Sequence, residues 1–304
     1  MSVAEDQAAY IRSLPAAQDK SAAEDYSSGD HFKKNEVAMS LKVCVAGATG
    51  WAGSELSRGI AAADDLTLIA AVARRHTGQK LGDVLGEPRL TAPIFANVTE
   101  ALTQPCDVFV EYTKPDSAKA NILTALEHGA CVVVGTSGLT DADYAQIDAM
   151  ARERRRGVLA CGNFALTMVL LQKFAVMAAK YIPQWEIIDY AYAGKPDAPS
   201  GTVRELAGRL GEVRQPALGL PLEQTVGVRE TRGGTLAGTQ VHAVRLPGFV
   251  LGAEVIFGMP DQTLTLRHNA GNSAKPYVDG ALLAIRKVSG LIGLHRGLDT
   301  VLEL

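Results

Sequence analysis

The feature that most constrains the fold is an alternation of short apolar runs, rich in β-branched residues, with helical stretches along residues 41–164. Strands that are joined through helices pair in parallel, and helices then cover both faces of the sheet. The pattern therefore predicts an α/β fold class with a parallel sheet. The expected strands are 42–46, 66–73, 107–112, 131–135 and 158–161, and the expected helices are 54–63, 117–128 and 141–154, the last with Thr140 as its N-cap.

The pattern changes after residue 164, where helices are expected at 167–180, near 203–210 and at 277–289. Between these helices, several strand-like runs follow one another with little helix between them. Such an order predicts an α+β second domain on a mostly antiparallel or mixed open sheet. The strands expected in it are 185–191, 225–232, 239–246, 251–258 and 262–269.

A glycine-rich turn, GxxGxxG, follows the first expected strand directly and opens the first expected helix. In a strand–turn–helix unit, such glycines let the backbone approach a pyrophosphate, which then binds the free N–H groups at the helix N-terminus. The turn predicts a Rossmann domain that binds a dinucleotide, with a purely structural turn as the alternative. The residues expected to bind the cofactor here are Gly47, Ala48, Thr49, Gly50, Trp51 and Ala52.

The second expected strand runs into Arg74 and Arg75 and has no acidic residue at its end. An acid at this position binds the adenosine ribose of NAD, whereas an arginine can bind the 2′-phosphate of NADP through two hydrogen bonds. The sequence therefore favours NADPH over NADH. Solvated loop charges are the alternative interpretation of this arginine pair.

The next two strand ends carry polar turns that we expect to meet at one edge of the sheet. Ligands of open α/β sheets bind at the carboxyl ends of the strands, so these turns are expected to face the nicotinamide half of the cofactor. Taken singly, each is also compatible with an ordinary loop. The residues assigned to this edge are Tyr112, Thr113, Gly135, Thr136 and Ser137, with Thr136 also expected to contact the substrate.

The segment 194–202 leaves a strand and leads into a helix near Val203. It combines an ammonium group, Lys195, with the hydroxyls and N–H groups of Ser200, Gly201 and Thr202 just before a helix N-terminus. This combination predicts a site for a carboxylate. A structural loop with an exposed lysine is the alternative.

Composition narrows the classes of function. The chain has 304 residues and a net charge of −3, which gives no basic face for nucleic acid. Its longest apolar runs are far shorter than the roughly 20 residues that cross a bilayer, so we expect no membrane partner. The four cysteines are far apart in the sequence, which predicts no disulfide framework and no metal site and favours a cytoplasmic location. Residues 1–39 lack a signal-peptide core and are expected to be a flexible extension.

From about Lys42 to the C-terminus, the sequence resembles the dihydrodipicolinate reductases, also called 4-hydroxy-tetrahydrodipicolinate reductases. The resemblance depends on several motifs in the same order along one chain. They are 45–50, Tyr112-Thr113-Lys114-Pro115, Gly135-Thr136-Ser137-Gly138, Gly162-Asn163-Phe164 and the segment 195–202, followed by returning strands at 232–234, 238–242, 254–258 and 264–268.

The resemblance implies NAD(P)H-dependent reduction of 4-hydroxy-tetrahydrodipicolinate, a small anionic cyclic imine, in lysine and diaminopimelate biosynthesis. It also implies a homotetramer formed through the second sheet. It assigns Asn163 and Phe164 to the cofactor, Lys195 to the reduced intermediate, and Ser200, Gly201 and Thr202 to a substrate carboxylate. The expected domains are 40–164 for the dinucleotide and 165–274 for substrate and oligomerisation, with 275–304 packing back on the first domain.

The chain departs from the family at a histidine pair that normally precedes the lysine and provides the proton donor. Counting back from Lys195, these positions are Ala191 and Tyr192. The proton donor is then Lys195, Tyr192 or bound water, and Tyr192 is assigned to catalysis beside Lys195. His242 and His268 are expected to be ordinary strand residues. A family arginine after the last strand also has no counterpart.

Three hypotheses for the function follow from this departure. The first is a reductase of the family's own substrate with an altered proton donor. The second is a related NAD(P)H-dependent reductase of a different small carboxylated imine. The third is a catalytically silent protein that binds NADPH.

Overall fold

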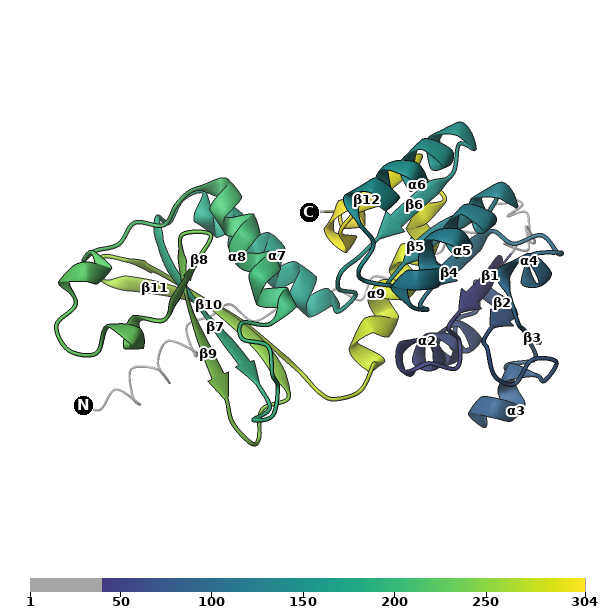
Figure 1. Cartoon of the computed structure of the whole chain (residues 1–304), viewed down its shortest axis with the longest axis horizontal. Helices are drawn as coiled ribbons and strands as arrows, with labels where there is room; N and C mark the ends of the chain where they lie inside the picture. Colours follow the sequence, from purple (N-terminus) through teal and green to yellow (C-terminus); the bar gives the residue numbers. More distant parts are fainter. Residues whose placement is uncertain (1–39, 304) are drawn as a thin grey trace, which may run out of the picture. The chain divides into compact units, whose positions relative to one another are not determined.

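The computed structural model describes residues 40–303, so the expected extension at 1–39 lies outside the described residues. Its first sheet has seven strands, all parallel, in the order β12-β6-β5-β4-β1-β2-β3 (Figure 1). The order reverses beside β1, which is the point where such sheets bind ligands. The strands are β1 Leu41–Ala46, β2 Leu66–Val72, β3 Ile94–Phe95, β4 Val108–Glu111, β5 Cys131–Val134, β6 Gly157–Ala160 and β12 Gly293–Arg296.

The five strands expected in this half are present, and the α/β fold class is confirmed. The two strands at the edges, β3 and β12, were not predicted. β3 has only two residues, too few for a pattern. β12 belongs to the C-terminal end of the chain and pairs with β6, which precedes it by more than a hundred residues.

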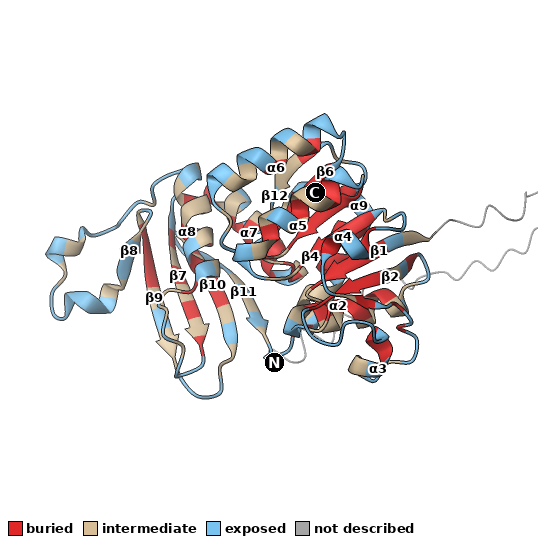
Figure 2. Cartoon of the chain, turned by 45° about the vertical axis from the view of Figure 1, so that its right-hand side comes forward, coloured by how far each residue is buried: buried red, intermediate tan, exposed pale blue. Residues whose placement is uncertain are grey.

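Helices cover both faces of this sheet, and each face has its own apolar core. All residues of β4 and β5 are buried, and Figure 2 shows buried residues of this sheet in red. One core includes residues of α2 and α9, and the other includes residues of α4, α5 and α6. The helices are α2 Trp51–Ala62, α3 Leu81–Leu85, α4 Val98–Ala101, α5 Pro115–Glu127, α6 Asp141–Glu153 and α9 Val278–Val288.

The starts of two helices show how local sequence fixes their boundaries. Thr140 caps α6 as expected, because its hydroxyl accepts a hydrogen bond from the N–H of Asp143, whose carboxylate in turn accepts one from Thr140. Helix α2 begins at Trp51, three residues before the expected start at Ser54. Gly50 is its N-cap, so the glycine-rich turn passes into the helix without an intervening loop.

The second sheet has five strands in the order β11-β10-β7-β9-β8. The pair β7 and β9 is parallel and the other pairs are antiparallel, which confirms the expected mixed sheet. Helices α7 and α8 share an apolar core with one face of this sheet. The elements are α7 Leu166–Ala179, β7 Gln184–Ala191, α8 Gly201–Val213, β8 Gly234–Leu236, β9 Thr239–Arg245, β10 Leu251–Met259 and β11 Gln262–Ala270.

The prediction of a strand at 225–232 is wrong. The chain there forms two short 3₁₀ turns, Leu222–Gln224 and Arg229–Arg232, separated by an exposed stretch. Val226 is 98% exposed, and Gly227 has a positive φ of 98°. The β-branched residues of this segment have no neighbouring strand to pair with in residues 40–303. The segment instead forms part of the long connection that a parallel pair such as β7 and β9 requires.

None of the helices in the described part of the chain combines the length and the apolar character needed to cross a lipid bilayer.

Two helical glycines provide a test of this packing. An added Cβ at Gly280 in α9 would lie 2.0 Å from the carbonyl oxygen of Phe164, whereas one at Gly208 in α8 would meet no atom within 4 Å. We expect Gly280→Ala to lower the free energy of unfolding by about 1–3 kcal/mol through overpacking. Gly208→Ala is expected to raise it by about 0.5–1 kcal/mol through helix propensity. Denaturant unfolding of the two variants measures both, and equal effects would contradict the close contact at α9.

Candidate active site

The glycine-rich turn between β1 and α2 is packed so closely that it excludes side chains. Gly47 has a positive φ of 80°, and a Cβ on it would lie 2.4 Å from the carbonyl oxygen of Tyr112. A Cβ on Gly53 would lie 2.1 Å from the carbonyl oxygen of Gly47. The turn therefore depends on both glycines, as expected for a backbone that approaches a ligand.

The N-terminus of α2 leaves hydrogen-bond donors free. The N–H of Gly50 donates to Gly47 and that of Ser54 donates to Gly50, but the N–H groups of Trp51, Ala52 and Gly53 have no partner within residues 40–303. Free donors at a helix N-terminus favour a negatively charged group. The turn and the helix therefore fit the pyrophosphate of a dinucleotide.

A cavity of about 410 Å³ lies beside this turn at the ends of β2 and β4. Arg74 is one of its lining residues, together with Gly47, Thr49 and Gly50. Arg75 is exposed but does not line this cavity. The two arginines that were predicted together are therefore separated by the structure, and only Arg74 lies beside the space that an adenosine half would occupy.

Glu111, the last residue of β4, is fully buried and holds the neighbouring turns together. Its carboxylate accepts hydrogen bonds from the N–H and hydroxyl of Thr113, from the amide of Asn121 and, at 3.3 Å, from the hydroxyl of Thr136. Burial raises the pKa of this carboxyl, and these hydrogen bonds oppose the rise. Glu111 thus fixes the ends of β4 and β5 relative to each other.

A second cavity, of about 360 Å³, is lined by the turns that follow β4 and β5 and by residues 161–164. The aromatic rings of Tyr112 and Phe164 pack edge to face in this region, with ring centroids 5.8 Å apart. Gly135 makes room for them, since a Cβ on it would overlap the ring of Tyr112. The hydroxyl of Tyr112 is buried and has no partner in the described residues. The predicted residues that line this cavity are Trp51, Ala52, Tyr112, Thr113, Gly135, Thr136, Ser137, Asn163, Phe164 and Thr202.

A third cavity, of about 280 Å³, continues from the second and shares Gly162, Asn163, Thr202 and Tyr277 with it. The predicted anion-binding residues Lys195, Ser200, Gly201 and Thr202 all line this third cavity, which we call the substrate cavity. The N–H groups of Gly201 and Thr202, in the first turn of α8, have no partner within residues 40–303. This cavity therefore offers an ammonium group and free N–H donors to an anion.

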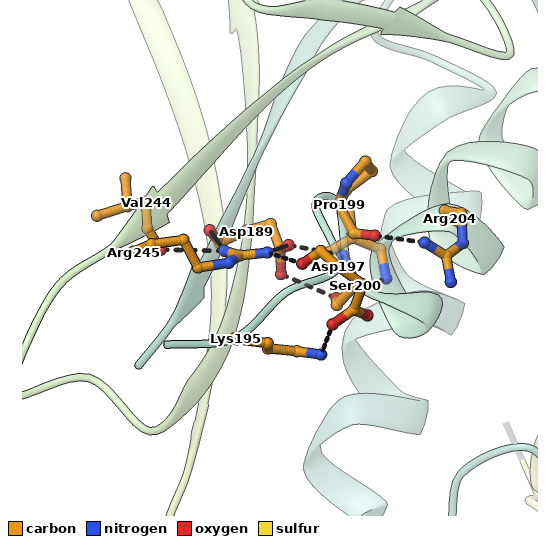
Figure 3. Close-up of polar contacts among 9 residues, drawn as sticks. Asp189, Lys195, Asp197, Pro199, Ser200, Arg204, Val244 and Arg245 are labelled. Atoms are coloured by element: carbon orange, nitrogen blue, oxygen red, sulfur yellow. Dashed lines mark hydrogen bonds and ion pairs between the residues drawn. The ribbon is translucent and has the colours of Figure 1, made fainter. Parts of the chain in front are cut away.

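The loop that carries these donors is anchored by an ion pair between Asp189 and Arg245 (Figure 3). Asp189 lies on the buried face of β7 and is 1% exposed. Its carboxylate accepts from the N–H of Ser200 at 2.7 Å, from the hydroxyl of Ser200 at 2.8 Å and from Arg245 at 2.7 Å. Arg245 also donates to the carbonyl oxygen of Asp197 at 2.7 Å. The guanidinium thus ties two points of the loop to the sheet.

Ser200 therefore has a different environment from the one expected of a substrate ligand. Both of its donors are engaged by Asp189, and its hydroxyl oxygen accepts from the N–H of Val203 as the N-cap of α8. The ammonium of Lys195 forms an ion pair with Asp197, and this hydrogen bond lowers the pKa of the Asp197 carboxyl. Lys195 is held at the cavity wall by this contact.

Tyr192 lies apart from these groups. It is 48% exposed and lines none of the three cavities, whereas Ala191 is fully buried. The two histidines that were expected to be ordinary strand residues also differ from each other. His242 contacts Glu186 at 2.7 Å, while His268 is half-buried and lines the substrate cavity.

The sequence did not reveal four residues of this region: Glu111, Asp189, Arg245 and Tyr277. Two of them have a signal in the sequence, because Glu111 ends an apolar run and Asp189 follows Trp185 and Ile187 in a strict alternation. A lone carboxylate at an interior position requires partners. Arg245 and Tyr277 have no local signal, since they belong to segments far along the chain. Among residues 40–303 there is no cluster of side chains suited to a metal ion.

Comparison with known proteins gives matches along nearly the whole described chain. A family model described as dihydrodipicolinate reductase, N-terminus, matches residues 41–164, and one described as dihydrodipicolinate reductase, C-terminus, matches residues 167–302. A protein of Halalkalibacterium halodurans named 4-hydroxy-tetrahydrodipicolinate reductase is 38% identical over 264 residues, which cover 86% of this chain and 100% of the relative. One of Desulfitobacterium hafniense with the same name is 38% identical over 268 residues, covering 86% and 99%.

Solved structures agree with these matches. A dipicolinate-bound dihydrodipicolinate reductase from a Paenisporosarcina species has a TM-score of 0.78 at 30% identity, and the match covers 87% of this chain and 100% of that chain. An amine dehydrogenase of Mycobacterium smegmatis has a TM-score of 0.58 at 17% identity, covering 84% and 94%, and is similar in fold alone.

The ion pair beneath the loop can be tested through stability. Arg245→Met would leave the buried carboxylate of Asp189 without its cation, which costs about 3–5 kcal/mol in free energy of unfolding. The matched control is Arg229→Met, which removes an exposed ion pair with Glu223 and should change stability by less than about 0.5 kcal/mol. Adding Asp189→Asn to Arg245→Met should recover part of the loss in a double-mutant cycle. Additive losses would show that the two residues are not coupled.

Proposed function

Because the chain belongs to the dihydrodipicolinate reductase family, whose members are NAD(P)H-dependent oxidoreductases, we propose that it reduces 4-hydroxy-tetrahydrodipicolinate to tetrahydrodipicolinate in lysine and diaminopimelate biosynthesis. The observation that carries this proposal is the substrate cavity, in which Lys195 and the free N–H groups of Gly201 and Thr202 face one space. A small dicarboxylate is the kind of ligand that these donors favour.

The cofactor contacts that we propose follow from the glycine-rich turn and the strand ends. The free N–H groups of Trp51 and Ala52 hold the pyrophosphate, and Arg74 holds the 2′-phosphate of NADPH. The turns around Thr113 and Thr136, fixed by Glu111, bind the nicotinamide half. The nicotinamide, when bound, supplies the hydride of the reduction. NADH is the alternative cofactor.

Lys195 acts on the charge that develops during the reduction. Hydride addition to an unsaturated imine ring pushes negative charge into the ring, and an ammonium fixed at the cavity wall stabilises that charge without reorganising. Gly201 and Thr202 orient the substrate through its carboxylate. Ser200 positions these two residues by capping α8 and binding Asp189.

A related reductase of a different carboxylated imine is the second candidate function. The observation that favours it concerns the end of β7, where neither Ala191 nor Tyr192 directs a proton donor into the three cavities. Ala191 is fully buried and Tyr192 lines none of the three cavities, so the pocket differs where the family has its proton donor. Under this proposal the anion-binding loop and the cofactor site keep their roles, and the ring that occupies the cavity changes.

We also propose that the protein is a cytoplasmic homotetramer in which the second sheet forms the subunit interface. This proposal is supported by the way in which the second sheet is covered. Helices α7 and α8 pack on one of its faces and form an apolar core with it. On the other face of β11, the residues that alternate with Leu266 are all exposed: Thr263, Thr265, Arg267 and Asn269. The corresponding division of the chain is a dinucleotide domain at 40–164 and a substrate and assembly domain at 165–274.

The proposed reaction is tested with substrate generated from pyruvate and aspartate semialdehyde by a coupled synthase, while the oxidation of NADPH is followed. We expect turnover by the wild-type protein and a loss in kcat of about 100-fold or more in Lys195→Ala, because one fixed donor to the developing charge is removed. Lys119→Ala, which removes a partly exposed ion pair between α5 and α6 with Asp143, is the control and should retain full activity. Tight NADPH binding without wild-type turnover would favour the second candidate or a silent binder.

The cofactor preference has a test of its own. Arg74→Ala should raise KM for NADPH by about 10- to 100-fold, because a charged hydrogen bond to the 2′-phosphate contributes about 1.5–3 kcal/mol. KM for NADH should stay nearly unchanged in the same variant. Arg75→Ala is the matched control, since Arg75 does not line the cavity beside the glycine-rich turn. Equal effects of Arg74→Ala on both cofactors would contradict a phosphate contact.

A further inference from the structure

Of the histidines in residues 40–303, one lines the substrate cavity, and this is His268 on β11. Along this strand Leu266 packs against the core beneath α7 and α8, and His268 and Ala270 follow it on the same face. Arg267 points to the opposite face, where its guanidinium lies 4.6 Å from the ring centroid of Tyr190. The alternation of the strand therefore directs His268 toward the cavity that holds Lys195.

The imidazole of His268 is oriented by a single contact. Its Nδ1 lies 2.9 Å from the hydroxyl oxygen of Thr167, in the first turn of α7. Its Nε2 has no hydrogen-bond partner within residues 40–303, and it is not a buried unsatisfied atom. In the imidazolium form, Nδ1–H donates to Thr167 and Nε2–H remains available to a ligand in the cavity.

The other titratable groups around the cavity are engaged. Asp189 pairs with Arg245, Glu205 with Arg209, and Lys195 with Asp197. Tyr190 bonds Glu254 on the outer face, and burial raises the pKa of Tyr277. Burial also lowers the pKa of His268, so its imidazolium releases a proton readily.

We propose that His268 is the general acid of this reductase and delivers a proton from Nε2 to the reduced ring. The proposal rests on the function proposed above and supplies the proton donor that is missing at Ala191 and Tyr192. It assigns the acid to β11, which is separated from β7 by β10 in the sheet.

The proton balance of the reaction defines the step. Loss of the substrate hydroxyl as water leaves a conjugated ring, and the added hydride brings two electrons and one hydrogen. The ring double bond shifts, and negative charge collects on the part of the ring conjugated with the imine nitrogen. The Nε2–H bond of His268 then breaks and a new bond to hydrogen forms on the ring. The neutral imidazole takes up a proton from solvent, so one substrate consumes one hydride and one proton.

The test compares two histidines of the same sheet, His268 on β11 and His242 on β9, with two strands between them. His268→Asn keeps a polar atom near the position of Nδ1 for Thr167 but removes Nε2, and we expect kcat to fall about 100-fold or more with KM changed less than about threefold. His242→Asn is the matched control, because His242 contacts Glu186 away from the cavity and should retain wild-type kcat. The wild-type kcat should fall as pH rises through the pKa of His268 in the complex, since the acid must be protonated. This fall should be absent in His268→Asn.

A second readout does not depend on turnover. The imidazole signals of the full chain with bound NADP⁺ are followed by NMR over pH, with and without dipicolinate as the probe. The two carboxylates should raise the pKa of His268 and leave that of His242 unchanged. Wild-type kcat in His268→Asn, a large loss in Tyr192→Phe instead, or a His268 pKa that does not respond to dipicolinate would overturn the proposal. Absence of wild-type turnover would contradict the proposed function, while the NMR titration would still decide the position of His268.

Discussion

The substrate side of this protein depends on one buried ion pair, between Asp189 on β7 and Arg245 on β9. A carboxylate on the helix-facing side of a sheet is costly unless charge and hydrogen bonds compensate it. Asp189 obtains both, from the guanidinium and from the N–H and hydroxyl of Ser200. The parallel pairing of β7 and β9 sets Arg245 opposite Ala191, two residues along from Asp189. The same contacts that neutralise the carboxylate therefore hold the start of α8 over the end of β7, and the free N–H groups of that helix face the cavity as a consequence.

The cofactor side uses a buried carboxylate in a related way, but without a cation. Glu111 ends β4 and binds Thr113, Asn121 and Thr136 through their amide and hydroxyl groups. With no cation beside it, burial raises the pKa of Glu111, whereas Asp189 has the guanidinium of Arg245 within hydrogen-bond distance. Two buried carboxylates, Glu111 and Asp189, thus hold the loops of the two halves of the site in place through hydrogen bonds. Neither is among the residues expected to touch a ligand. In both cases a buried acid at or near the end of a strand accepts hydrogen bonds from residues that follow it, and these contacts fix the loops at that edge of the sheet.

Much of this arrangement could be predicted from local sequence. Buried parallel strands are continuous apolar runs, and the glycine-rich turn has a fixed position between strand and helix, so the first sheet and the cofactor edge followed from residues near one another. The rest depends on partners far along the chain. The expected strand at 225–232 failed because no strand lies beside it in the described structure, and β12 was missed because its partner is β6. Arg74 and Arg75 look equivalent in sequence, yet only the first lines a cavity, since consecutive side chains leave a chain in different directions.

The proton donor shows why position in a strand matters more than distance in sequence. Trp185, Ile187, Asp189 and Ala191 form the buried face of β7, so Tyr192, one residue further, is turned away from it. Ala191, at the end of that buried face, is fully buried and has no titratable group. β11 lies two strands away, roughly 10 Å across the sheet, and its His268 lines the substrate cavity. Under the proposal for His268, the proton would reach the ring from β11 and not from β7. The proposed acid therefore lies on a strand that carries neither of the two buried carboxylates, since Asp189 lies on β7 and Glu111 on β4.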